Sequence, residues 1–417
     1  MMSKGKNAVA GYPACAPLLG RPVPGSSHPA RRRTPVLRNT GSRGVPGHPA
    51  LAGGLLAAAL LTWPLLAQAS LSSWAKEVLH LGIYRERVAT LQATLSEDHS
   101  TWGLAFSPHG RYLAASSPQT AFVQLWDWRR GRVVRRFRRS GSDIESTTPL
   151  AYSPHGRLLA SCQSDADTII QVWSTRTGAV VGNIPNSGGG CAAIAFSPQG
   201  HSLIWIRELT YVASPKVRQI FVTSTRTWTI RWALATGLFQ SNALTVSAHG
   251  HWAALWGGQF GWSKPRGSVK KVYSVIPQIV LVNLTTHRIE RTVSMPQGTN
   301  MPGAVAWNPR ARVVAVGVQG ALHVGLDNVI RLYNAHTGAL VGGESGPTKT
   351  WVTALRYTPH GRYLIEAGIH HEVEIWDGNH HRLLQKIPHQ AWSLAVSPHG
   401  HYLALGEGGQ IQVWRFR

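Results

Sequence analysis

A nine-residue phrase recurs along this chain and constrains its fold more than any other feature. Each copy joins an apolar strand-like residue to a tight Ser-Pro-His-Gly-like turn and a second apolar run. The seven copies are FSPHGRYLA (Phe106–Ala114), YSPHGRLLA (Tyr152–Ala160), FSPQGHSLI (Phe196–Ile204), VSAHGHWAA (Val246–Ala254), WNPRARVVA (Trp307–Ala315), YTPHGRYLI (Tyr357–Ile365) and VSPHGHYLA (Val396–Ala404). Measured between their third residues, successive copies lie 46, 44, 50, 61, 50 and 39 residues apart. This period predicts a β-propeller with one copy per blade.

Two further elements complete each predicted blade. A third strand with alternating apolar residues follows every copy, as VQLWD (Val123–Asp127), IQVWS (Ile170–Ser174), TIRWA (Thr229–Ala233), IVLVN (Ile279–Asn283), IRLYN (Ile330–Asn334), VEIWD (Val373–Asp377) and IQVWR (Ile411–Arg415). A turn such as Thr177-Gly178, Thr236-Gly237 or Thr337-Gly338 then leads to a short fourth strand. One four-stranded blade is too small to be stable alone, so we expect an all-β ring of seven antiparallel blades. Five tryptophans should anchor its core: Trp126, Trp173, Trp232, Trp376 and Trp414.

The seventh copy lacks a fourth strand after Ile411–Arg415. The segment ERVATLQATL (Glu86–Leu95) is similar to the fourth strands RVVRRF (Arg132–Phe137) and RLLQKI (Arg382–Ile387). We therefore expect this N-terminal strand to pair with the last blade, which would close the ring and remove an exposed sheet edge.

The region before the repeats differs in composition. Residues 1–49 form a basic, loop-like leader without acidic residues, and residues 50–69 are an uncharged apolar run ending on Ala67-Gln68-Ala69. This order is typical of a secretory signal peptide, although about 20 apolar residues could also remain as a membrane anchor. We expect residues 70–85 to be a linker or short helix and residues 86–417 to be the propeller. The protein should then lie outside the cytoplasm, secreted or membrane-anchored.

The cysteines do not predict a disulfide framework. Besides Cys15 in the leader, only Cys162 and Cys191 are present, on neighbouring predicted blades. A bridge between them is conceivable, but we expect two small buried hydrophobes.

Histidine and arginine occupy the tight turns in place of acids. The third turn position carries His109, His155, Gln199, His249, Arg310, His360 and His399. The fifth position carries Arg111, Arg157, His201, His251, Arg312, Arg362 and His401. These turns lie on one face of a propeller, which should be cationic, more so below the ordinary histidine pKa of about 6.5. The alternative is that histidine is simply tolerated there. We expect no zinc site, because equivalent turns of diverging blades stand on the order of 10 Å apart.

The third and fourth predicted blades carry insertions of roughly 15 residues between their second and third strands. Long loops on a rigid scaffold usually carry function, and these should lie opposite the histidine turns. The candidate partner-binding residues are Arg207, Tyr211, Lys216, Arg218, Phe260, Trp262, Lys264, Arg266, Lys270, Lys271 and Tyr273. Aromatic rings among cations suit a carbohydrate, an anionic polymer or an acidic protein segment. The alternative is an extra hairpin packed on its own aromatic residues.

Together the SPxG turns, the xxWD-like strands and the TG turns make residues 86–417 resemble a WD40-type propeller. In that family a histidine before the first strand, a Ser or Thr, a turn aspartate and the tryptophan usually form a hydrogen-bonded network. Here only His99 and His389 stand in the pattern H-x-x-W-x-L-A, and the turn aspartate is replaced. The chain is therefore similar to degenerate, bacterial-type members.

The resemblance implies a non-catalytic interaction scaffold. A formal net charge of +24 favours a protein or anionic polymer or surface as partner. The export signal argues against nucleic acid, a membrane contact would run through residues 50–69, and we expect a monomer without cofactor. The alternative is a propeller enzyme of the lactonase or hydrolase type with a site in the central channel, but no set of nucleophile, base and orienting residue stands out.

Overall fold

The computed structural model describes residues 87–140, 149–163, 168–185, 190–208, 219–238, 240–263, 272–295, 299–320, 329–345, 351–369, 372–379 and 382–417. The chain divides into two compact units, Met1–Ile83 and Tyr84–Arg417. The leader, the apolar run at 50–69 and the expected linker lie outside the described residues, so only the second unit is discussed.

The second unit consists of seven four-stranded antiparallel sheets, numbered here as blades in chain order. Blade 1 contains β2 (Gly103–Phe106), β3 (Tyr112–Ser116), β4 (Phe122–Asp127) and β5 (Arg132–Arg138), and blade 2 contains β6 (Leu150–Tyr152), β7 (Leu158–Cys162), β8 (Thr168–Ser174) and β9 (Val180–Pro185). Blade 3 contains β10 (Gly190–Phe196), β11 (Ser202–Glu208), β12 (Gln219–Ser224) and β13 (Ile230–Ala235), and blade 4 contains β14 (Gln240–Val246), β15 (Trp252–Ser263), β16 (Val272–Asn283) and β17 (Arg288–Ser294).

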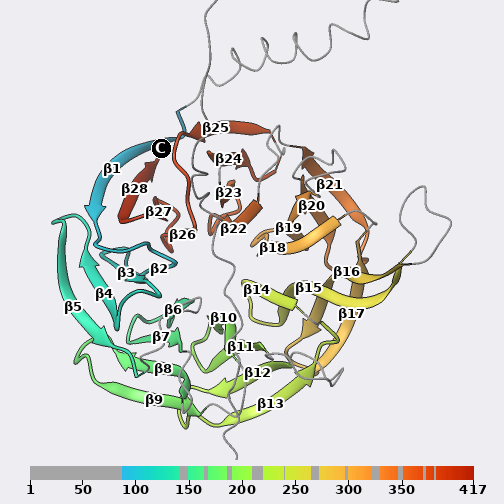
Figure 1. The fold of residues 1–417 in the computed structure, drawn as a ribbon, viewed down its shortest axis with the longest axis horizontal. Coiled ribbons are helices and arrows are strands. Elements are labelled where there is room, and N and C mark those ends of the chain that lie inside the picture. Colours follow the sequence, from blue (N-terminus) through green and yellow to red (C-terminus); the bar gives the residue numbers. More distant parts are fainter. Residues whose placement is uncertain are drawn as a thin grey trace, which may run out of the picture. The chain divides into compact units, whose positions relative to one another are not determined.

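Blade 5 contains β18 (Thr299–Trp307), β19 (Val313–Gly320), β20 (Val329–Asn334) and β21 (Leu340–Ser345), and blade 6 contains β22 (Trp351–Tyr357), β23 (Tyr363–Ile369), β24 (Val373–Asp377) and β25 (Leu383–Ile387). Blade 7 contains β26 (Ser393–Val396), β27 (Tyr402–Glu407) and β28 (Gln410–Phe416), completed by β1 (Ala89–Ser96). Figure 1 shows the first strand of each blade near the centre of the ring and the fourth at its rim. The predicted seven-bladed, all-β fold is confirmed.

The predicted ring closure is also confirmed. β1 pairs antiparallel with β28 from Ala89 opposite Phe416 to Ser96 opposite Gln410. The blue and red strands lie side by side at the rim in Figure 1. The N-terminal strand therefore covers an edge that the last blade would otherwise expose.

Local chemistry explains why the repeated phrase forms a tight hairpin. In blade 1 the Gly110 amide donates to the Ser107 carbonyl at 2.7 Å, and Gly110 has a φ of 65°, which glycine accepts without a steric penalty. The Ser107 hydroxyl accepts the Tyr112 amide at 3.0 Å. The same hydroxyl bond recurs in blades 2, 3, 4, 6 and 7. All of these bonds join residues within one turn, so the sequence alone can specify it.

In blade 3 the predicted third strand was wrong. β12 (Gln219–Ser224) occupies the third position, and Leu203 of β11 lies opposite Thr223. The predicted segment Thr229–Ala233 instead forms most of β13, the fourth strand, so Trp232 stands outside the tryptophan position of the other blades. Thr236-Gly237 consequently follows the fourth strand rather than preceding it.

In blade 4 the insertion is largely an extension of two strands. β15 and β16 are each 12 residues long and stay paired from Trp252 opposite Asn283 to Ser263 opposite Val272. β17 pairs only with Gln278–Asn283, so the far half of the hairpin extends beyond its neighbour on that side. The extra hairpin that the sequence left as an alternative is therefore present.

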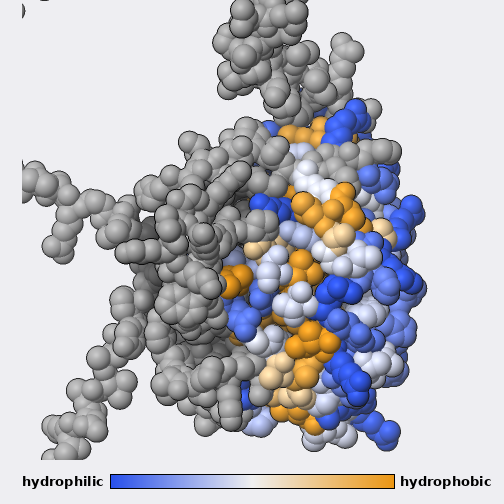
Figure 2. All heavy atoms as spheres, turned by 90° about the vertical axis from the view of Figure 1, so that its right-hand side faces the viewer, coloured by the Kyte–Doolittle hydropathy of each residue, from blue (hydrophilic) through white to orange (hydrophobic). Residues whose placement is uncertain are grey.

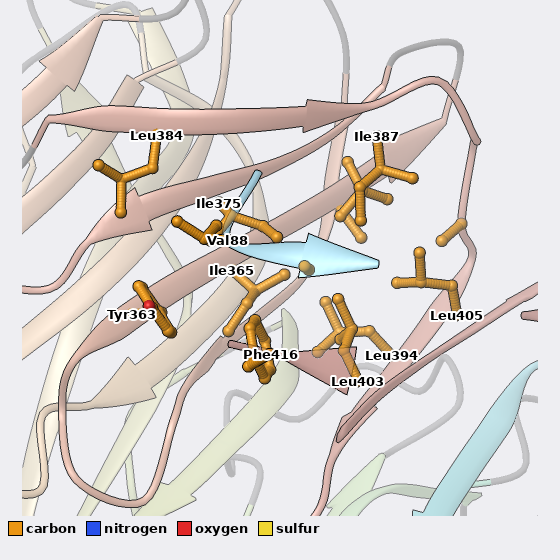
Figure 3. Packing of buried hydrophobic residues seen from close by; sticks show 14 residues of the cluster. Val88, Tyr363, Ile365, Ile375, Leu384, Ile387, Leu394, Leu403, Leu405 and Phe416 are labelled. Atoms are coloured by element: carbon orange, nitrogen blue, oxygen red, sulfur yellow. The ribbon is translucent and has the colours of Figure 1, made fainter. Parts of the chain in front are cut away.

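Apolar side chains fill the spaces between neighbouring blades. Figure 3 shows one such cluster, where Ile365 and Ile375 of blade 6 meet Leu403 of blade 7 and Val88 before β1. Trp126, Trp173 and Trp376 are buried and Trp414 is partly buried, each opposite a leucine of the second strand. These four tryptophans are core residues as predicted, because each lies between adjacent sheets.

The expectation that Cys162 and Cys191 are two separate hydrophobes was wrong. They form a disulfide bond with a Cα–Cα distance of 5.4 Å. Cys162 ends β7 of blade 2 and Cys191 lies in β10 of blade 3, and both are buried. The bond closes a loop of 29 residues and ties two neighbouring blades, which sequence distance alone could not reveal.

The rim of the ring mixes apolar and hydrophilic residues. The exposed large apolar side chains of the fourth strands are Leu91, Val134, Val180, Val181, Ile230, Ile289, Leu340 and Val341. Figure 2 faces part of this rim and shows orange apolar patches among blue hydrophilic ones. The apolar residues are scattered along the rim, which is usual for a protein surface.

Candidate functional site on the turn face

The turns between first and second strands pack against one another around the ring. A Cβ placed on Gly156 of the blade 2 turn would lie 3.0 Å from Pro108 of the blade 1 turn. The same glycine-to-proline approach joins blades 2 and 3, 3 and 4, 5 and 6, and 6 and 7, while Gly110 of blade 1 faces Ser397 of blade 7. The turns therefore pack against one another at six of the seven blade junctions, and we call the surface that they form the turn face.

Basic side chains project from this ring. All eight residues predicted for the basic face are exposed: His109, Arg111, His155, Arg157, His360, Arg362, His399 and His401. Some rest on aromatic rings, since the Arg111 guanidinium lies 5.1 Å from the Tyr112 ring centroid and that of Arg362 lies 5.0 Å from Tyr363. These contacts hold the cations over the surface without neutralising them.

The five-residue turns themselves contain no acid in any blade. A second set of turns, between third and fourth strands, lies on the same face because antiparallel strands return to it. There Asp127 is buried and pairs with Arg130 at 2.9 Å. The exposed cations of the first set thus face solvent without acidic partners in their own turns.

The second set of turns contacts the fourth strand of the preceding blade, and the contacting residues are complementary in size. Arg135 of blade 1 donates to the Thr177 carbonyl at 2.7 Å beside Gly178, whose φ is 83°. At the junction between blades 2 and 3 the large residue lies in the turn and the small one in the fourth strand, because Trp228 of blade 3 packs against Gly182 of blade 2. Trp228 takes the place of the turn glycine and keeps a φ of 59°. The inter-blade contact therefore compensates a backbone conformation that bulky residues rarely adopt.

The junction between blades 3 and 4 uses two aromatic rings. His287, also at a φ of 59°, stacks on Trp232 with ring centroids 4.5 Å apart. Beside this stack lies a hollow of about 440 Å³. Its lining residues are Ser197, Gln199, His201, Ser202, Ile204, Val222, Arg231, Trp232, Gly250, Leu284 and His287. The hollow combines an apolar floor with one arginine and two histidines, and no acid lines it.

A second hollow of about 390 Å³ lies at blade 7. It is lined by Thr90, Gln92, His401, Arg415, Phe416 and Arg417. Both hollows on the turn face are thus lined by basic and not by acidic residues. An anionic group is the ligand chemistry that such a surface attracts.

The predicted loop site lies mostly outside the described residues. This holds for Tyr211, Lys216, Arg218, Lys264, Arg266, Lys270 and Lys271, while Phe260, Trp262 and Tyr273 are described only as strand positions of β15 and β16. Arg207 is partly buried, with its guanidinium 4.5 Å from the Phe221 ring centroid, and burial lowers the pKa of Arg207. Of the described ones, Trp262 and Tyr273 lie opposite each other in the paired hairpin. The binding role of the whole set stays a prediction.

The sequence missed Arg231, Trp232 and His287 as surface residues of the hollow. Trp232 was assigned to the core because the blade 3 insertion hid the true third strand. A signal was present at Trp228 and His287, which replace the glycine of the Thr-Gly turns. Such a replacement indicates a compensating contact from another blade.

The histidine and tryptophan positions use acceptors other than a turn aspartate. Trp126 donates its indole N–H to Glu97 at 2.7 Å, and His389 lies 3.5 Å from Glu407. Burial lowers the pKa of His389, and the Glu407 charge opposes this shift. Glu97, directly after β1, and Glu407, the last residue of β27, thus partly replace the network that the resemblance implies.

Seven four-stranded blades closed by an N-terminal strand define a β-propeller, a class whose faces commonly bind other proteins. The family of WD domain, G-beta repeats matches residues 87–127 and 138–174. Together with the seven blades, this match identifies the chain as a WD40-type seven-bladed β-propeller. A search of curated proteins found no significant match. No helix among the described residues is long and apolar enough to span a bilayer.

Proposed function

We propose that this propeller is a non-catalytic interaction scaffold that binds a protein or another anionic partner through its turn face. The observation that carries the proposal is the ring of exposed histidines and arginines, whose own turns contain no acid. Basic surfaces of this kind raise the local concentration of acidic partners and speed their association. The hollow between blades 3 and 4 would anchor an acidic side chain with an apolar neighbour.

The composition of the inner strands supports a non-catalytic role. A hydrolase of the central-channel type would need carboxylates or histidines there. The first strands of the seven blades, as the structure delimits them, contain no Asp, Glu or His. The enzyme alternative therefore has no residues to carry it along these strands.

Export or membrane anchoring belongs to the same proposal. The apolar run at 50–69 after a basic leader supports it, and so does the Cys162–Cys191 disulfide, because such bonds persist mainly in oxidising compartments. Fractionation of producing cells is the test. A protein that stays in the cytoplasm with free thiols would contradict this part of the proposal.

The turn face is tested by charge reversal. In the triple variant Arg111→Glu, Arg157→Glu and Arg362→Glu, we expect binding to poly-glutamate and to anionic vesicles to weaken at least tenfold, because repulsion replaces attraction. The control Arg138→Glu reverses an exposed arginine at the far end of β5 and should retain binding. Lys270→Glu with Lys271→Glu tests the opposite face. If only this last pair abolished binding, the loop site would replace the turn face.

A further inference from the structure

The inner strands of the seven blades carry a single charged side chain, Arg356 of β22. The residue two places before each tight turn occupies the same position in every blade. In the other six blades it is Ala105, Ala151, Ala195, Thr245, Ala306 and Ala395. Small uncharged residues are thus the rule at this level of the ring, and Arg356 is an isolated departure from it.

Arg356 belongs to an inner strand, next to the centre of the ring (Figure 1). Inner strands of a propeller surround its central channel. The Arg356 side chain is exposed, yet desolvation by the surrounding protein lowers the pKa of its guanidinium from the ordinary value. Since Arg356 stands two residues before the blade 6 turn, it lies at the turn-face mouth of the channel.

Most of the hydrogen-bonding capacity of Arg356 has no partner among the residues that the structure describes. Its Nη1 donates to the Leu355 carbonyl at 2.9 Å, and none of the carboxylates in the described ranges forms an ion pair with it. A guanidinium has five N–H donors. In the antiparallel sheet Leu355 lies opposite Glu366, and Glu366 lies opposite Glu374, whereas Arg356 lies opposite Ile365. Both glutamates therefore lie on the other face of the sheet and cannot pair with Arg356.

From this geometry we infer that Arg356 binds a small oxyanion, a carboxylate or a phosphate, inside the turn-face mouth of the central channel. The exposed guanidinium keeps donors free for a ligand, and its planar fork matches two oxygens of one oxyanion. The basic turn face outside the mouth raises the local anion concentration.

The same chemistry could come from two sources, a free anion or the carboxylate of an inserted peptide. The probes are therefore sodium acetate, sodium phosphate and the blocked peptide acetyl-Gly-Glu-Gly-amide, each compared with sodium chloride at equal ionic strength. Thermal unfolding of the purified full chain is measured, because an anion that binds only the folded state raises Tm as its concentration passes Kd. We expect a saturable rise in Tm with at least one probe.

Variants identify the site. Arg356→Gln and Arg356→Ala should remove the saturable rise, and both should fold, since five other blades carry alanine at this position. The control Arg138→Gln removes an exposed arginine outside the turn face and should keep it. A response to acetate or phosphate would assign a free anion, and a response to the peptide alone a partner carboxylate. An unchanged response in Arg356→Gln, or none in the wild type, would overturn the inference.

This site is independent of the proposed partner surface. The triple turn-face variant keeps Arg356, so it should lose poly-glutamate binding while retaining the saturable response to small anions. Conversely, Arg356→Gln should retain poly-glutamate binding. The two ideas can therefore fail separately.

Discussion

Leu95 of β1 lies directly opposite Ile411 of β28, and both side chains are buried in the same core cluster. The pair joins the start of the described chain to its last strand. Closure of the ring thus rests on apolar packing as well as on backbone hydrogen bonds. Residues in β1 should accordingly affect the stability of the whole propeller.

Truncation of the buried closing residue tests this conclusion. Leu95 is 2% exposed, so Leu95→Ala should cost about 2–5 kcal/mol of unfolding free energy, through lost burial and the cavity left behind. Leu91 in the same strand is 47% exposed, and Leu91→Ala should cost much less. Urea denaturation of both variants gives the comparison. Equal losses would mean that β1 is not packed as described.

The disulfide between blades 2 and 3 should stabilise the folded protein. The variant Cys162→Ala with Cys191→Ala should lose about 2–4 kcal/mol, since the cross-link restricts the unfolded chain. Reduction with dithiothreitol should lower the wild-type Tm and leave the double variant unchanged. Sensitivity of the double variant to the reductant would show that the effect has another origin.

Glu366 should make stability depend on pH. Burial raises its pKa from 4.5 to about 8, the Glu374 charge adds to the shift, and Lys386 opposes it. The folded state therefore holds the proton more strongly than the unfolded state, and the free energy of unfolding falls as pH rises from about 4.5 to about 8. Glu366→Gln imitates the protonated form, so its stability relative to wild type should increase between pH 7 and pH 9.

Two other groups determine the choice of that pH range. Burial raises the pKa of Glu97 to about 6, and burial lowers the pKa of His389, so both titrate below pH 7. Urea denaturation at pH 7, 8 and 9 then isolates Glu366. Glu290→Gln changes an exposed carboxyl and serves as the control. A constant difference between Glu366→Gln and wild type across this range would contradict the buried acid.

Gly182 packs directly against the Trp228 ring of the neighbouring blade, so the stability effects of mutations at these two positions should be coupled. Gly182→Ala should destabilise by about 1–3 kcal/mol, because the new Cβ would overlap the Trp228 ring. In the Trp228→Ala background the same change should cost little. A double-mutant cycle measured by urea denaturation gives the coupling. Additive effects would show that the two residues are not in contact.

Much of the fold could be predicted because its signals are local. The Ser107 hydroxyl, the Gly110 backbone and the Tyr112 amide lie within six residues, and the same turn marks six of the seven blades. The alternation of apolar residues also gave the third strands, except in blade 3. There the insertion and the loss of the turn glycine to Trp228 moved the true strand to Gln219–Ser224.

The candidate site was predicted less completely. The basic turns were visible because they belong to the repeat, whereas the hollow beside Trp232 and His287 needs two blades in contact. Arg356 was not selected either, since a single arginine in an apolar strand has no distinguishing local pattern. Its position beside the channel becomes evident only when the seven inner strands are superposed by register.

The amino-acid sequence alone determined the number of blades, the tight turns and the basic character of one face, since these follow from hydrogen bonds and side-chain alternation over a few residues. Only the tertiary structure decided the disulfide partners, the third strand of blade 3, the Trp232–His287 stack and the surroundings of Arg356. Each of these depends on which surfaces meet when neighbouring blades pack, and residues far apart in the chain set that contact.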